Sequence, residues 1–207
     1  MDSKKNASMN EEEQNGYFVD TENLPDAFPT HLHSAEFWEA LGRAVAAFGF
    51  LEETLGKAIF AFTATREIPE DKIDEEFAKW LPTLERALSD PLGGLIRSFE
   101  TAVRTHQQAS ISNFDDMIED LRHVAALRNV LCHGSWRVPN GRGQCIPFFV
   151  DRKNRIFNTP IDTAYLVQLR VDVVKLTCAV INTVAHLGWQ FPGSAGPGNP
   201  IVDQQTT

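Results

Sequence analysis

The amino-acid sequence predicts an all-α fold, an up-and-down bundle of about five helices with a small β-hairpin inserted before the last one. Five segments carry apolar residues at spacings of three and four, which is the period of an amphipathic helix. Capping and breaking residues separate these segments. The hairpin is predicted over residues 145–157, where a DRKN turn joins two short apolar runs.

The first predicted helix follows Ser34, a favourable N-cap residue, and runs to about Thr65. A second covers about residues 73–88. Pro82 lies within this second segment and should kink the helix or split it into two pieces.

The third predicted helix covers about residues 90–105 and ends in a polar run, so we expect His106 in solvent. The last helix is capped by Asp162 or Thr159 and runs to about Leu187. Both segments place their leucine, isoleucine, phenylalanine and valine residues on one face, and this face should be buried in a hydrophobic core.

The fourth predicted helix, residues 113–133, has signals at both ends. Asn113 is a favourable N-cap residue, and the two aspartates that follow Phe114 suit the positive end of the helix dipole. Gly134 fits the left-handed position that commonly ends a helix.

Composition limits the function classes. The chain has 207 residues, 43% of them hydrophobic, which is enough for one sizeable core. Its formal net charge of -9 argues against a general nucleic-acid coat or a membrane-surface protein, since both need a broad cationic surface. Three cysteines without a CxxC pair suit a reducing compartment, and no segment resembles a signal peptide or a membrane span. We therefore expect a cytoplasmic protein without membrane contact.

Three regions are expected along the chain. Residues 1–30 are acidic and lack apolar periodicity, which predicts a disordered lead-in. Residues 31–188 form the predicted helical domain, and residues 189–207, rich in glycine and proline, form a flexible tail. His31 and His33 have no third ligand in view, and we expect neither a metal nor a cofactor.

The most polar cluster on an otherwise amphipathic helix lies at the end of the fourth segment. Arg128, Asn129 and His133 fall within one and a half turns there, and we take them as the candidate site. Glu52 lies on the apolar stripe of the first helix. It either reaches water or Lys57 at the edge of that stripe, or it orients a buried cation such as Arg128.

The stretch RNVLCHG from Arg128 to Gly134 resembles the RxxxxH signature of the HEPN superfamily. The order of elements over about residues 35–187 is similar too, with a GFLE step at residues 49–52 of the long first helix. The resemblance implies a homodimer in which two motif helices face each other and form a metal-independent endoribonuclease site. It also suggests a toxin or defence role, with a cognate inhibitor or antitoxin as a partner.

The side chains of the motif suit that chemistry. A histidine such as His133 exchanges protons near neutral pH, and Arg128 offers a planar fork for two phosphate oxygens. Asn129, four residues before His133, lies on the same face and would orient the imidazole or bind phosphate. Arg128 and His133 are about 140° apart around an ideal helix, so either the arginine swings round or each site borrows a residue from the other protomer.

The segment after the motif is locally cationic. Between Gly134 and Asn158 there are five positive residues against one acidic residue, an excess of four: Arg137, Arg142, Arg152, Lys153 and Arg155 against Asp151. These cations either bind RNA phosphates or form an ordinary solvated surface.

Two functions of different classes remain open at this point. The first is the HEPN-like endoribonuclease. The second is a non-catalytic HEPN-like module that mediates oligomerisation or binds protein or nucleic acid. In a third and plainer interpretation, Arg128 caps carbonyl groups or pairs with Glu52 and serves stability alone.

Overall fold

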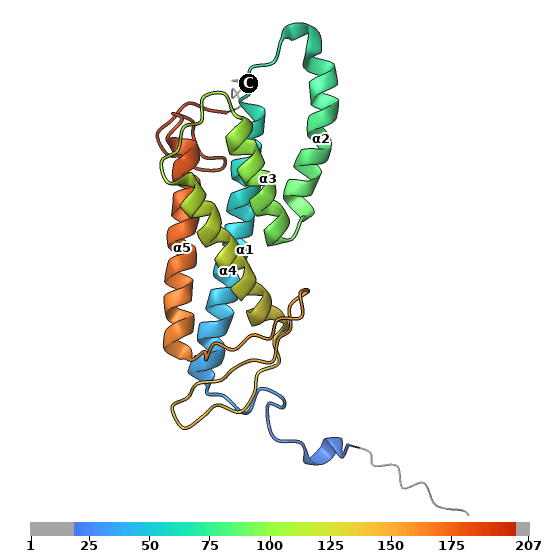
Figure 1. Ribbon diagram of the computed structural model, residues 1–207, viewed down its shortest axis with the longest axis vertical. Coiled ribbons are helices and arrows are strands. Elements are labelled where there is room, and N and C mark those ends of the chain that lie inside the picture. Colours follow the sequence, from blue (N-terminus) through green and yellow to red (C-terminus); the bar gives the residue numbers. More distant parts are fainter. Residues whose placement is uncertain (1–18, 202–207) are drawn as a thin grey trace, which may run out of the picture. The chain divides into compact units, whose positions relative to one another are not determined.

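The computed structural model describes residues 19–201, and within this range the protein has five α-helices and no β-strand (Figure 1). Successive helices alternate in direction, so that α1 and α5 run parallel (Figure 1). The predicted all-α fold of about five helices is confirmed. The helix bounds are α1 Ala35–Ala64, α2 Ile73–Ser89, α3 Leu92–Thr105, α4 Phe114–His133 and α5 Thr163–Ala185.

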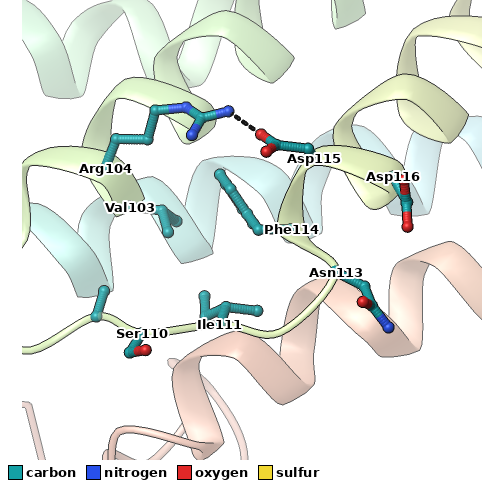
Figure 2. A pocket seen from close by; sticks show the side chains of 9 residues that line it. Val103, Arg104, Ser110, Ile111, Asn113, Phe114, Asp115 and Asp116 are labelled. Carbon is teal, nitrogen blue, oxygen red and sulfur yellow. Dashed lines mark hydrogen bonds and ion pairs between the residues drawn. The ribbon is translucent and has the colours of Figure 1, made fainter.

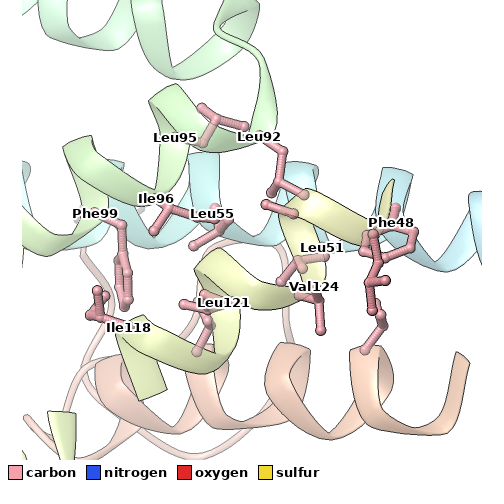
Figure 3. Close-up of a cluster of buried hydrophobic side chains, with 14 of the residues drawn as sticks. Phe48, Leu51, Leu55, Leu92, Leu95, Ile96, Phe99, Ile118, Leu121 and Val124 are labelled. Carbon is pink, nitrogen blue, oxygen red and sulfur yellow. The ribbon is translucent and has the colours of Figure 1, made fainter. Parts of the chain in front are cut away.

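The core is built around α1, which packs against each of the other four helices. Ser34 caps α1 as predicted, since its hydroxyl accepts a hydrogen bond from the Phe37 N–H at 3.3 Å. Figure 3 shows leucine, isoleucine and phenylalanine side chains of α1, α3 and α4 meeting in one cluster. The largest fully buried side chains of α1 are Phe48, Phe62, Leu51, Leu55 and Ile59.

The predicted hairpin between α4 and α5 is not found in the described residues. Isolated antiparallel bridges occur there instead, because successive residues of the run 145–150 pair with different segments. Cys145 pairs with Ile161, Phe148 with Ser135 and Val150 with Ile156. Pro147 lies inside this run and has no N–H to donate, so no continuous ladder forms.

The contacts divide the chain between His31 and Leu32. Residues 19–31 are exposed and contain a short 3-10 helix, Thr21–Asn23, whose first turn is capped by the Asp20 carboxylate. The prediction of disorder for residues 1–18 lies outside the described residues.

Residues 189–201 follow α5. The Gln190 N–H donates to the Asn199 carbonyl oxygen at 2.8 Å, while Trp189, Phe191 and Ile201 pack, partly buried, against the core. The part of the chain that the structure describes contains no helix long and apolar enough to cross a membrane.

Of the two outcomes predicted for Pro82, a kink or a split, the split is wrong, because α2 continues from Ile73 to Ser89 with the proline inside it. The prediction for His106 was wrong as well. His106 is buried at 6% exposure rather than solvated. It ends α3, its ring packs edge-on to Phe62 with centroids 5.7 Å apart, and its Nε2 lies 3.1 Å from the Thr65 hydroxyl.

Burial of His106 predicts a pH-dependent stability. Burial lowers the pKa of His106 below its ordinary value of 6.5, and the positive charge of Arg66 lowers it further. The unfolded chain therefore binds a proton more readily than the folded chain, and His106 contributes stability above the unfolded pKa that is lost as pH falls through the folded pKa. We expect a lower free energy of unfolding in urea at about pH 5.5 than at about pH 7.5.

The variant His106→Asn should show a smaller loss between the two pH values. His186→Asn is the matched control, because His186 is exposed at the end of α5. An equal pH dependence in all three proteins would contradict the assignment to His106.

Candidate functional site

The end of α4 is fixed by a close backbone contact. Gly134 follows the helix, and its N–H donates to the Val130 carbonyl oxygen at 2.8 Å. Its φ is -72° and ψ is 140°, so the predicted left-handed conformation is wrong. A Cβ at this position would lie 2.6 Å from the Val130 oxygen and 3.0 Å from Pro147 Cβ. Glycine is therefore needed for space, because the connecting segment returns directly over the helix end.

Arg128 and Glu52 come together between α4 and α1. Arg128 Nη2 lies 3.5 Å from Glu52 Oε1, and each side chain is 28% exposed. The same Glu52 oxygen is buried and has no hydrogen-bond partner among the described residues. The two groups thus attract each other by charge without an aligned hydrogen bond, which leaves the guanidinium N–H groups available to another acceptor.

Asn129 and His133 lie on the exposed side of α4. The two residues are one helical turn apart. Among the residues that the structure describes, neither side chain has a hydrogen-bond or ion-pair partner. Cys132, also exposed, lies beside His133 on the last turn. The structure therefore brings Arg128 to Glu52 but leaves Asn129 and His133 open to solvent.

The segment that follows the motif, residues 134–158, is the cationic insert. It is tied to the bundle at its start: Ser135 and Phe148 exchange two backbone hydrogen bonds of 2.9 and 2.8 Å. His33 Nε2 lies 2.8 Å from the Arg137 carbonyl oxygen. Cys145 is buried, and burial raises the pKa of its thiol. These contacts hold the insert immediately beside the end of α4.

The five predicted cations of the insert are all exposed. Arg137 lies over the Phe148 ring, 5.1 Å from its centroid. Arg155 pairs with Asp151 at 2.7 Å, and the backbone hydrogen bond from Arg155 is the main cause of the lowered pKa of that carboxyl. Arg142, Arg152 and Lys153 make no ion pair with any residue between positions 19 and 201.

The sequence reasoning missed one feature of the insert, an outward apolar strip. Along residues 145–150 buried or half-buried side chains alternate with exposed ones, as in an extended backbone. The exposed members are Ile146, Phe148 and Val150, and Ile156 joins them across its bridge with Val150. The residues of both faces are apolar in the sequence, so hydrophobicity alone could not show which face would be exposed.

A cavity of about 640 Å³ lies at the opposite end of α4, roughly 28 Å from His133 by helix length (Figure 2). Arg104 and Asp115 form an ion pair at its rim (Figure 2). Asn113 precedes α4 as predicted, but it has φ 57° and its side chain makes no capping bond. The amide residue is there because asparagine tolerates the left-handed conformation. This cavity is separate from the motif.

No group of three or more His, Cys, Asp or Glu side chains placed to hold a metal ion occurs between residues 19 and 201. Comparisons with known protein families, with characterised proteins and with solved structures find no match. The HEPN resemblance therefore remains an expectation from the sequence motif.

The close contact at Gly134 generates a stability prediction. Gly134→Ala should lower the free energy of unfolding by about 1–3 kcal/mol, because the new methyl group has no room. Gly141→Ala is the control, since a Cβ at Gly141 meets nothing within 4 Å, and it should change stability by about 0.5 kcal/mol or less. Equal effects in urea denaturation would contradict this reason for glycine.

The pairing of Glu52 with Arg128 is tested by a double-mutant cycle. Glu52→Gln, Arg128→Gln and the combined variant should show a coupling of about 1 kcal/mol in favour of the native pair, because both groups are half-shielded from water. Additive effects would mean that the two charges do not interact in solution.

Proposed function

We propose that this protein is a HEPN-like, metal-independent endoribonuclease whose site is composed of Arg128, Asn129 and His133 from two copies of the chain. One observation supports the proposal most: Glu52 lies against Arg128, while His133 is exposed on the same helix end beside the cationic insert. A guanidinium held by a carboxylate and an accessible imidazole are the groups that metal-free RNA cleavage requires.

Each residue has a role in the proposed reaction. The 2′-oxygen attacks the phosphorus and the bond from phosphorus to the 5′-oxygen breaks, leaving a cyclic phosphate and a 5′-hydroxyl. One imidazole takes the proton of the 2′-hydroxyl, and a second, protonated imidazole gives a proton to the leaving oxygen. Arg128 offsets the charge that develops on phosphate, and Asn129 orients the substrate or the imidazole. Glu52 is a positioning residue for Arg128.

The two imidazoles come from two protomers in this proposal. Within one chain Arg128 and His133 point about 140° apart, so the His133 of a second copy completes the site more easily. The side of α1 that bears Glu52 leaves room for this approach. Gly49, three residues before Glu52, and Gly42, one further heptad back, have nothing within 4 Å of a built Cβ.

The cationic insert supplies the proposed RNA contacts. Arg142, Arg152 and Lys153 are exposed without ion-pair partners in the described part of the chain, so they are available to phosphate. Arg137, over the Phe148 ring, and Arg155, paired with Asp151, belong to the same cationic insert. We place this activity in the cytoplasm, in the toxin or defence role, with a cognate inhibitor or antitoxin, that the HEPN resemblance implies.

The second candidate is a non-catalytic HEPN-like interaction module, and a specific feature of α5 favours it. Val167, Val171 and Val174 are exposed at 44%, 37% and 48% and share one face of that helix. Together with the net charge of -9, such a surface suits a protein partner. In this candidate Arg128 and Glu52 serve stability alone.

Cleavage of RNA in EDTA decides between the two candidates. We expect the wild-type protein to release fragments with cyclic phosphate ends, and His133→Ala and Arg128→Ala to lose about a hundredfold or more in rate. Glu52→Gln should lose less, because it disturbs only the position of Arg128. An excess of His133→Ala should inhibit the wild-type protein if the site is shared between copies, because a mixed dimer holds one imidazole where the proposed reaction uses two.

His123→Ala is the matched control. His123 lies on α4 but lines a separate cavity between α4 and α5, so this variant should cleave at the wild-type rate. Equal rates for all variants, or none for any protein, would rule out the nuclease. In that case a stable oligomer without salt-sensitive RNA affinity would support the interaction module.

A further inference from the structure

Helix α2 has a wider apolar face than the fold covers. Of its residues only Ala87 is buried, where its carbonyl approaches Gly56 of α1. Trp80 is half-buried and donates a hydrogen bond to the Thr63 hydroxyl at 2.8 Å. The exposed large apolar residues of α2 form the α2 face, and their exposed fractions are Ile73 50%, Phe77 52%, Leu81 41% and Leu88 81%.

Acidic residues border the α2 face. Residues 66–90 contain eight acidic and four basic residues, an excess of four negative charges. Lys79 is already paired with Glu75 and Glu76 on the far side of the helix. Glu85 lies four residues after Leu81, and neither Glu85 nor Asp74 has an ion-pair partner among the residues that the structure places. The α2 face thus combines apolar surface with an uncompensated negative edge.

The outward apolar strip of the cationic insert is bordered by positive instead of negative charges. This insert face exposes Ile146 46%, Phe148 51%, Val150 42% and Ile156 67%. Arg152 and Lys153 lie in the turn between Val150 and Ile156, and the insert carries an excess of four positive charges. Apolar surface with an uncompensated positive edge is therefore present in the same chain.

The two faces match in size as well as in charge. Each exposes on the order of 400 Å² of apolar surface, and a standard protein interface buries about 800 Å² per partner, somewhat over half of it apolar. The α2 face from Ile73 to Leu88 is roughly 22 Å long, and the extended run from Ile146 to Val150, roughly 13 Å long, would cover a little over half of that length.

We propose that the α2 face of one copy of this chain binds the insert face of a second copy, with Glu85 opposite Lys153. The contact joins two different surfaces, so each bound pair of copies leaves one α2 face and one insert face free. Such a head-to-tail contact adds further copies until a ring closes or the chain of copies ends. The inference rests on exposure and charge, and it does not depend on the nuclease proposal.

Sedimentation equilibrium of the full chain without RNA tests this contact. The weight-average mass of the wild-type protein should rise with concentration and fall with added salt. Glu85→Lys and Lys153→Glu should each weaken association about tenfold, because like charges then meet across the contact. The double variant, and an equal mixture of the two single variants, should regain wild-type association.

Glu119→Lys is the control, since it makes the same charge change on an exposed position of α4 and should associate like the wild type. Leu88→Asp should weaken association without lowering the free energy of unfolding, because this side chain is 81% exposed.

A wild-type mass that is independent of concentration overturns the proposal. So does sensitivity to Glu85→Lys without sensitivity to Lys153→Glu, which means that α2 pairs with itself. The reverse pattern, which means that the insert pairs with itself, overturns it as well. Arg128→Ala and His133→Ala should associate normally, so failure of the nuclease proposal and failure of this one are distinguishable.

Discussion

Burial of α1 is the constraint on which the rest of the fold depends. All four other helices pack against it, and side chains such as Phe48, Leu51 and Leu55 are fully enclosed. Each of them contributes roughly 1.5–3 kcal/mol through the removal of apolar surface from water. Glu52 follows directly after Leu51 on this buried helix, so its backbone position is set by the core. That is why Arg128, on a different helix, meets a fixed partner rather than solvent.

Much of the fold was predictable because the helices have a regular apolar period and clear N-caps at Ser34 and Asp162. The pairing of Glu52 with Arg128 was one of the stated alternatives, since a carboxylate on an apolar stripe needs a cation. The failures share a cause. Burial of His106 depends on α1, which is distant in sequence, while the space at Gly134 is limited both by Val130 on the same helix and by the distant Pro147. Local patterns do not report the distant contacts. The hairpin failed for the same reason, because its residues found other partners.

The two proposals concern the same cations. Arg152 and Lys153 are two of the residues proposed to bind RNA phosphate, and they are also the positive edge of the insert face. A second copy bound there would cover them, so nucleic acid and self-association would compete for one surface. High salt would weaken both contacts, since both depend on exposed charges.

Helix α2 buries a single residue, Ala87, and is otherwise held by half-buried side chains such as Trp80, which packs beside Phe60 and donates a hydrogen bond to Thr63. Segments of this kind open locally at a free energy well below that of global unfolding. Backbone amides of α2 should consequently exchange with deuterated solvent sooner than those of α1. A partner that binds over α2 raises the free energy of local opening of this helix by mass action. The protection of the α2 amides from exchange then measures the fraction of the protein that has the partner bound.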